Sequence, residues 1–219
     1  MIFGLTIPAA PMSPVFSAPP FPSDPTPDGA SPGALPCPAA TDRVVLRLWR
    51  ASDLPAFARL NADPEVMRYF PTTLDRAQSD AVAERLQRHF DTHGYGPWAL
   101  EIPGVTPFAG FVGLMRVGYD VPFAPAVEIG WRLARPFWGA GYATEAARSV
   151  TQFAFGALGL PGLVSFTVPA NARSRAVMTR IGMQHCVGED FMHPLVPPGH
   201  RLRRHVLYRL AASATGPSE

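Results

Sequence analysis

The pattern of hydrophobic and polar positions in the first half of the periodic part of the chain predicts one strand followed by three helices. Residues 43–50 are rich in valine and leucine and alternate in part with polar residues, which is typical of a strand. Ser52 precedes apolar residues at helical spacing, so we expect it to cap a helix over residues 52–60. A short helix is predicted over residues 63–70 and a longer one over residues 74–92. The apolar side of the longer helix is expected to hold Ala77, Ala81, Val82, Leu86 and Phe90.

Shorter apolar runs separated by glycines then predict a sheet. Residues 98–102, 108–119 and 126–134 follow one another closely, so we expect three consecutive strands in an antiparallel meander. The remaining segments are a helix over 142–158, a strand over 163–168, a helix over 174–181, a loop over 189–201 and a strand over 203–210. The predicted fold class is α/β, with a mixed, mostly antiparallel sheet flanked by helices.

Composition divides the chain into three parts. The first 40 residues hold 11 of the 26 prolines and only two charged residues, Asp24 and Asp28. Such a tract buries too little surface to offset the entropy of ordering, so we expect residues 1–40 to be disordered. Residues 41–210 are expected to form one domain, and residues 211–219 a disordered tail.

Charge and cysteine content narrow the classes of function. The net charge is only +2, and the 19 basic residues, all arginine, are scattered among 17 acidic ones, which argues against nucleic acid as a partner. No apolar run is long enough for a membrane helix, and residues 1–10 lack the basic start of a signal peptide. Cys37 and Cys186 cannot build a disulfide framework or a zinc site, so we expect a cytoplasmic protein without a metal.

A turn with two glycines carries the clearest chemical signal. Gly139 and Gly141 lie between the predicted strand at 126–134 and the helix at 142–158, where main-chain N–H groups at a helix start can bind a pyrophosphate. A third glycine of a dinucleotide fingerprint is missing, and the sequence has no lysine for a Walker A loop. Nicotinamide nucleotides and nucleoside triphosphates are therefore disfavoured.

Four motifs in a fixed order resemble the GNAT N-acetyltransferases, particularly those of the RimJ/RimL type. They are residues 128–133, 138–145, 171–174 and 181–183, and the resemblance covers about residues 41–210. It implies the GNAT acyl-CoA N-acyltransferase fold, with acetyl-CoA as co-substrate. It also implies direct transfer of the acetyl group to a primary amine, either a small molecule or a protein N-terminus. One departure is Pro136, which stands where the family often has glutamine or arginine, with Arg135 one position earlier.

The resemblance also implies which residues contact the coenzyme. The turn would bind the pyrophosphate, Asn171 would hydrogen-bond the pantetheine amides, and the strand at 131–133 would pair with pantetheine and stabilise the oxyanion through main-chain N–H groups. The expected coenzyme-binding residues are Trp131, Leu133, Trp138, Gly139, Ala140, Gly141, Tyr142, Ala143, Asn171 and Ser174.

Three residues are candidates for the catalytic steps. Glu128 is an acid between apolar neighbours on a strand, so it is expected either to remove the proton of the amine or to lie on a solvated strand face. His193, in the predicted loop, is a second candidate base, although a surface histidine is the commoner finding. Ser174 is expected from the resemblance to donate to the departing thiolate, and its alternative role is a helix cap.

The sequence also allows other functions and other roles for several residues. A binding module that keeps the coenzyme turn without catalysis and an acyltransferase for longer acyl groups both fit the motifs. Four aromatic residues either wall the amine site or belong to the core: Tyr69, Phe70, Tyr95 and Trp98. His89 and His93 have the spacing of a metal pair but lack a third ligand. Exposed strand edges would allow a homodimer.

Overall fold

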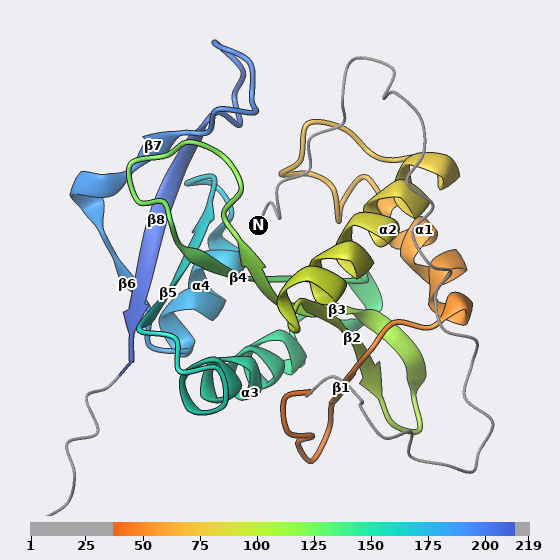
Figure 1. The fold of residues 1–219 in the computed structure, drawn as a ribbon. Coiled ribbons are helices and arrows are strands. Elements are labelled where there is room, and N and C mark those ends of the chain that lie inside the picture. Colours follow the sequence, from red (N-terminus) through yellow and green to blue (C-terminus); the bar gives the residue numbers. More distant parts are fainter. Residues whose placement is uncertain (1–36, 213–219) are drawn as a thin grey trace, which may run out of the picture.

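The computed structural model describes residues 37–212, which form one continuous sheet with helices on both faces (Figure 1). The strands are β1 (Val45–Arg47), β2 (Pro97–Ile102), β3 (Thr106–Arg116), β4 (Val127–Leu133), β5 (Gly162–Thr167), β6 (Gln184–His185), β7 (Phe191–Met192) and β8 (Arg204–Ala211). Their order across the sheet is β1-β2-β3-β4-β5-β8-β6, and β7 pairs with β8. The predicted disorder of residues 1–40 and 211–219 falls mostly outside the described residues. Where these segments are described, the Ala39 carbonyl oxygen accepts a hydrogen bond from the Ser149 hydroxyl (2.6 Å), and Ala211 is the last residue of β8.

Four α-helices surround the sheet. They are α1 (Leu54–Ala62), α2 (Arg76–His93), α3 (Tyr142–Gly156) and α4 (Ala172–Arg180), with short 3-10 turns η1 (Ala51–Asp53), η2 (Arg135–Phe137) and η3 (Val187–Glu189). Gly94, with a φ of 72°, ends α2 in the left-handed conformation that favours glycine. None of the helices between residues 37 and 212 is both long and apolar enough to span a bilayer.

The register confirms a mixed, mostly antiparallel sheet. β2, β3 and β4 form the predicted antiparallel meander, and only β4 and β5 run parallel among the paired strands of the described residues. β3 and β4 are in register over seven residue pairs, whereas β4 and β5 are in register at the single pair Glu128 and Val164. The two parallel strands therefore separate beyond Glu128, and a gap opens at the centre of the sheet.

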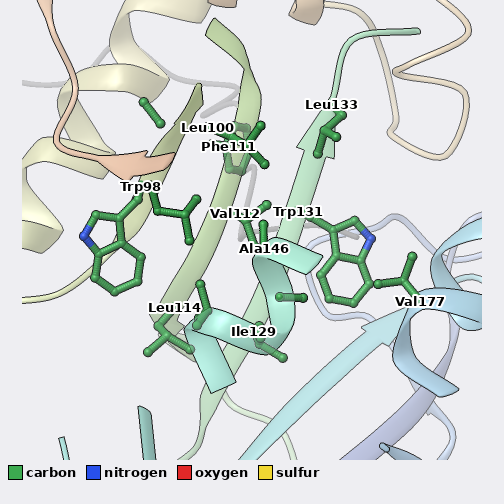
Figure 2. Close-up of a cluster of buried hydrophobic side chains, with 14 of the residues drawn as sticks. Trp98, Leu100, Phe111, Val112, Leu114, Ile129, Trp131, Leu133, Ala146 and Val177 are labelled. Atoms are coloured by element: carbon green, nitrogen blue, oxygen red, sulfur yellow. The ribbon is translucent and has the colours of Figure 1, made fainter. Parts of the chain in front are cut away.

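The side chains of β4 alternate between the two faces of the sheet. Ile129, Trp131 and Leu133 pack toward α3 and α4, as Figure 2 shows with Ala146 of α3 beside them. Glu128, Gly130 and Arg132 face the opposite side, where α1 lies. Strand β4 thus connects two chemically different regions of the molecule.

Two predictions about the segments around α1 were wrong. Residues 63–70 form turns instead of a helix, because the Asp63 side chain accepts hydrogen bonds from the N–H groups of Glu65 (2.8 Å) and Val66 (3.4 Å). Ser52 lies inside η1, so it does not occupy the N-cap of α1, which is Asp53.

The details of α2 and of the predicted loop at 189–201 also differ. The buried face of α2 consists of Ser79, Ala83, Leu86 and Phe90, while Ala77 and Ala81 are exposed. Leu86 and Phe90 are thus buried as predicted, whereas toward the start of the helix the polar Ser79 is buried and its hydroxyl accepts a hydrogen bond from the Asn61 side chain of α1 (2.9 Å). The loop region contains the two-residue strand β7, which pairs with β8.

Candidate active site

A groove with a volume of about 1290 Å³ lies beside α3 and α4 at the end of β4, where it also reaches Arg132 on the other face of the strand. Its wall is formed by the end of β4, the turn before α3, the start of α4 and two segments from the N-terminal half, residues 39–43 and 65–70. Every residue predicted to bind the coenzyme contributes to this wall: Trp131, Leu133, Trp138, Gly139, Ala140, Gly141, Tyr142, Ala143, Asn171 and Ser174. Residues from three of the four motifs therefore come together in one place, and the fourth, at 181–183, lies outside the groove wall.

The turn before α3 has the backbone conformation that an anion site at a helix start requires. Gly139 and Gly141 have φ angles of 79° and 88°, in the left-handed region that disfavours residues with a Cβ atom. Gly141 is the N-cap residue of α3 and carries no side chain that could occupy the unpaired N–H groups of the first helical turn. These N–H groups and the positive end of the helix dipole line the groove, which suits a pyrophosphate.

Two residues near the start of the described chain hold this turn in place. Arg43 pairs with Glu145 in the first turn of α3 and donates a hydrogen bond to the carbonyl oxygen of Ala140 (3.0 Å). The Thr41 hydroxyl donates to the same carboxylate, and the Arg43 guanidinium lies 5.1 Å from the centre of the Tyr142 ring. These hydrogen bonds lower the pKa of Glu145 although partial burial alone would raise it. Sequence reasoning missed this support because its partners are 102 residues apart.

The groove is strongly positive. Its walls carry six arginines and two acidic residues: Arg43, Arg68, Arg132, Arg148, Arg173, Arg180, Glu65 and Glu145. The Arg173 guanidinium lies 4.6 Å from the centre of the Trp138 ring, which fixes both side chains at the mouth of the groove. A polyanion such as a diphosphate would be attracted here without any single cation in the turn itself. Arg135 is exposed and outside the groove, so it does not replace the residue missing at Pro136.

The gap between β4 and β5 opens into the groove. The Ser165 hydroxyl of β5 donates to the carbonyl oxygen of Ile129 (2.9 Å), and the Trp138 indole donates to the carbonyl oxygen of Leu133 (2.7 Å). Because peptide groups alternate along a strand, the N–H and C=O groups of Trp131 point into the same gap. An extended ligand lying in the gap would therefore meet main-chain groups of β4.

Asn171 and Ser174 hold the other side of the gap. Asn171 is the N-cap of α4: its side-chain oxygen accepts from the N–H of Ser174 (3.3 Å), and its amide nitrogen donates to the Thr167 hydroxyl (3.0 Å). The cap is thus Asn171, and the alternative role of Ser174 as a cap was wrong. Ser174 lies in the first turn of α4. It is only 9% exposed and belongs to the groove wall.

Glu128 is buried on the face of β4 that points away from α3. It is 3% exposed, and Oε1 has no hydrogen-bond partner among the described residues. Burial raises the pKa of its carboxyl group well above 4.5. The alternative of a solvated acid on the wet face of the strand is therefore wrong. Burial and the charge of Glu128 together raise the pKa of Tyr119, so the two side chains are neighbours.

His193 is buried as well, which overturns the expectation of a surface histidine. It follows β7 directly, is 0% exposed, and its ring lies 4.8 Å from that of Tyr119 and 4.9 Å from that of His205. Burial lowers the pKa of His193 to about 4 and that of His205 to about 3, so both imidazoles are neutral at pH 7. Neither Glu128 nor His193 belongs to the groove wall; Tyr119 links them on the opposite side of β4.

Comparison with known proteins identifies the family. The Acetyltransferase (GNAT) domain family matches residues 43–184. The chain belongs to the GNAT acetyltransferases. It is 32% identical to the uncharacterised protein YkkB of Bacillus subtilis over 146 residues, covering 66% of this chain and 84% of that protein.

Two further proteins support the assignment to this family. The chain is 31% identical over 158 residues to the FsC-acetyl coenzyme A-N(2)-transacetylase of Aspergillus fumigatus, covering 64% of this chain and 62% of that enzyme. An acetyltransferase structure from Agrobacterium tumefaciens superposes with a TM-score of 0.63 at 28% identity, covering 84% of this chain and all of that one. The chain is therefore an acetyl-CoA-dependent N-acetyltransferase, and its groove has the charge and main-chain donors that acetyl-CoA requires.

The four aromatic residues of the GNAT acetyltransferase separate into two groups. Tyr69 and Phe70 belong to the groove wall, and the Tyr69 hydroxyl donates to the carbonyl oxygen of Ala170 (3.0 Å). Trp98 is 0% exposed in the core, and Tyr95 packs against the rings of His89 and His93 outside the groove. Of the two alternatives, the core location holds for Trp98, while Tyr69 and Phe70 are the two that line the groove.

Both ring nitrogens of His89, the first histidine of the pair on α2, are occupied by main-chain contacts. His89 Nδ1 bonds the carbonyl oxygen of Tyr95 (2.8 Å), and its Nε2 accepts from the N–H of Arg116 (3.1 Å). Burial lowers the pKa of His89 to about 4. The part of the chain that the structure describes contains no group of three or more side chains that could hold a metal ion.

Proposed function

We propose that this acetyltransferase transfers the acetyl group directly to a primary amine, without a covalent acyl-enzyme. The observation that carries the proposal is the gap between β4 and β5. The positive groove with its glycine turn opens on one face of β4, and the buried carboxyl group of Glu128 lies on the other. Coenzyme and amine would thus approach the gap from opposite sides of the sheet and meet there.

The residues of the groove have distinct parts in binding acetyl-CoA. The N–H groups of the turn at Gly139 and Gly141 would hold the pyrophosphate, helped by the positive charge of Arg173 and Arg148. Main-chain groups of Trp131 and Leu133 would pair with the pantetheine arm and stabilise the oxyanion. Asn171 already uses both ends of its amide in holding the start of α4, so it would shape the gap and offer its remaining hydrogen-bonding capacity to pantetheine.

Glu128 is the general base in this proposal. An amine must lose a proton before or during attack, and a base works best when its pKa lies near the working pH. Burial raises the pKa of Glu128 toward that range, whereas it lowers the pKa of His193 to about 4. We therefore assign proton removal to Glu128. His193 is proposed to have a smaller effect on turnover, as a neutral imidazole beside Tyr119.

Ser174 is proposed to assist departure of the thiolate. Its position one turn into α4, in the groove wall beside the gap, suits a hydroxyl that donates to sulfur. Cys186, the one cysteine within the predicted domain, precedes η3 and does not line the groove. Burial raises the pKa of its thiol, which makes it a poor nucleophile and favours direct attack by the amine.

The acceptor is proposed to be a primary amine, either a small molecule or the N-terminus of a protein, as in enzymes of the RimJ/RimL type. The fold supports many acceptors, so the choice depends on the side chains near the gap. The edge strands β1 and β6 would also permit pairing of two copies, and a homodimer stays a prediction that light scattering can test.

The proposal is tested by thiol release from acetyl-CoA with a panel of amines, with mass detection of the acetylated product. We expect product with at least one primary amine, and a large loss of turnover for Glu128→Gln with coenzyme affinity preserved. Full turnover by Glu128→Gln, His193→Ala and Ser174→Ala alike would contradict the assigned roles. A protein that binds acetyl-CoA and yields no product with any amine would contradict the proposed acceptor.

A further inference from the structure

Arg132 is a buried cation on the same face of β4 as Glu128. The residue is 5% exposed and takes part in none of the ion pairs found among residues 37–212. Its guanidinium lies 4.1 Å from the centre of the Phe70 ring and 5.3 Å from that of Phe111. Nη1 donates to the side-chain oxygen of Asn61 at 2.5 Å, and Asn61 is fixed in turn by Ser79. The guanidinium is therefore held firmly in one orientation.

One edge of this guanidinium is left without a hydrogen-bond acceptor. Nε and Nη2 are both buried, and neither has a partner among the described residues. Their N–H groups point in parallel from the same edge of the planar group. In this geometry they can donate two hydrogen bonds to the two oxygens of one carboxylate. The contacts of Arg132 with neutral side chains thus fix its position and leave the edge formed by Nε and Nη2 without an acceptor among the described residues.

An unpaired cation at this place destabilises the fold. Burial, and the nearby charge of Arg85, lower the pKa of Arg132 to about 9, so the guanidinium stays charged at pH 7. A buried charge without a counter-ion is strongly destabilising, as it is when one partner of a buried ion pair is removed. A ligand that carries the missing negative charge would offset this cost.

The position of Arg132 indicates which ligand this is. Arg132 and Phe70 belong to the groove wall, while Gly130, which has no side chain, separates Arg132 from Glu128 along the same strand face. Glu128 and Arg132 are four residues apart on one strand, a span of about 13 Å. A small molecule that contacts the Arg132 edge would need to extend over no more than this length to approach the gap where the acetyl group is proposed to be transferred.

We infer that Arg132 binds a carboxylate of the acceptor, so that the substrates of this enzyme are small primary amines that also carry a carboxylate. The inference rests on the proposed transfer to an amine and specifies its substrate class. Phe70 and Phe111 would position the guanidinium, Asn61 would orient it, and the paired N–H groups would select amino-acid-like acceptors over uncharged amines and polyamines. Arg132 would act as a specificity-determining residue, with proton removal left to Glu128.

The test uses matched pairs of amines that differ only in the anionic group. Glycine, β-alanine, 4-aminobutyrate and phenylalanine would each be compared with their carboxamides, for the wild-type protein and for Arg132→Met and Arg132→Lys. The ratio of kcat/KM within a pair, compared between proteins, cancels the difference in amine basicity. Arg135→Met is the control, because Arg135 is exposed and lies outside the groove.

We expect at least one carboxylate to be preferred over its carboxamide. Loss of a charged bidentate contact should raise KM for that carboxylate roughly tenfold to hundredfold in Arg132→Met, with kcat and the carboxamide little changed. Arg132→Lys should recover part of the loss, and Arg135→Met should behave as wild type. Equal use of both members of every pair, or equal loss for both in Arg132→Met, would overturn the inference.

A binding measurement separates this inference from the proposed function. Calorimetric titration of the CoA-loaded protein with each pair involves no turnover, so it reports recognition of the carboxylate alone. Carboxylate-selective binding that disappears in Arg132→Met, without any acetylated product, would support the site and contradict the proposed transfer. Product formation without such selectivity in either assay would support the transfer and contradict the site.

Discussion

The two faces of β4 offer different chemistry to a ligand. On the face toward α3, the groove has main-chain N–H groups at two glycines of positive φ, together with exposed arginines such as Arg148 and Arg173. On the opposite face, Glu128, Arg132 and, through Tyr119, His193 are buried side chains with polar atoms that lack partners in the described part of the chain. In our proposal the backbone binds the shared coenzyme, whereas proton transfer and the choice of acceptor depend on a few buried side chains whose pKa values are shifted by burial.

Replacing the proposed base should have the largest effect, because it should reduce turnover without affecting the groove face of β4. Glu128→Gln keeps the shape of the side chain and removes its basicity, so we expect kcat to fall roughly 10²- to 10⁴-fold. The affinity for CoA, measured by calorimetry, should be unchanged because Glu128 lies outside the groove wall. The matched variant His193→Gln, also buried beside Tyr119, should lose much less. A larger loss for His193→Gln would assign proton removal to the histidine.

The same substitution should raise stability at high pH. The pKa of Glu128 is raised by burial, so the stability present below pH 4.5 is lost as pH rises through the higher folded pKa. Above that pKa the folded protein must hold a buried carboxylate, while the unfolded chain exposes it to water. Glu128→Gln should therefore unfold at a higher temperature than wild type at pH 8, with the difference disappearing toward pH 4. An equal difference at both pH values would contradict a buried, titrating carboxyl group.

Blocking the glycine turn should affect only the groove face. Gly141 has a φ of 88°, and a Cβ atom there would lie 3.4 Å from the Arg43 guanidinium, so valine would distort the turn. Losing one or two hydrogen bonds to a charged group should weaken CoA binding roughly hundredfold. Gly156→Ala in α3, where an added Cβ meets nothing within 4 Å, is the control and should bind CoA normally. Wild-type affinity in a folded Gly141→Val protein would exclude the turn as the pyrophosphate site.

Removing the Ser174 hydroxyl should have an intermediate effect. Since Asn171 provides the helix cap, Ser174→Ala should leave the stability of α4 nearly unchanged. One lost hydrogen bond to the leaving thiolate corresponds to a decrease in kcat of roughly tenfold. Thermal unfolding would check the unchanged stability, and steady-state kinetics on the same preparation would check the decrease in kcat. A stability loss with unchanged kcat would assign Ser174 a structural role.

Weakening the contacts of Glu145 with Arg43 and Thr41 behind the turn should give the smallest change in CoA affinity. Glu145→Gln weakens the contacts with Arg43 and Thr41, and a surface pair of this kind contributes up to about 1 kcal/mol. The affinity for CoA should therefore fall only about threefold to fivefold. Asp80→Asn, which removes the Arg76 pair on the distant surface of α2, is the control. Equal changes in CoA affinity for the two variants would show that Arg43 does not position the turn.

Local sequence signals predicted the parts of the fold that depend on neighbouring residues. The meander from β2 to β4 follows from alternating apolar runs separated by glycines, and the turn before α3 from two glycines between a strand and a helix. The segment at 63–70 failed because a single aspartate side chain formed a local turn in place of a helix. The buried face of α2 was predicted correctly at Leu86 and Phe90 but not toward the start of the helix, where Ser79 contacts another helix.

Contacts between distant segments account for what the sequence could not reveal about the site. The support of the turn by Arg43 joins residues 102 positions apart, and the orientation of Arg132 by Asn61 joins residues 71 apart. The burial of His193 results from packing against Tyr119 and His205, which no spacing rule indicates. The residues predicted to bind the coenzyme belong to short motifs, and all of them lie in the wall of one groove. On the other face of β4, the sequence indicated Glu128 and His193 as candidates, whereas Arg132 was found only when the strands were assembled.

A crystal structure of the protein with acetyl-CoA would test the central claim most directly. We expect the pyrophosphate oxygens to lie within hydrogen-bond distance of the N–H groups at 139–143 and the pantetheine arm to enter the gap beside Trp131. Its acetyl group should reach the side of the sheet on which Glu128 lies. A coenzyme bound with its pyrophosphate away from this turn, or with its acetyl group closed off from the Glu128 face, would contradict the account.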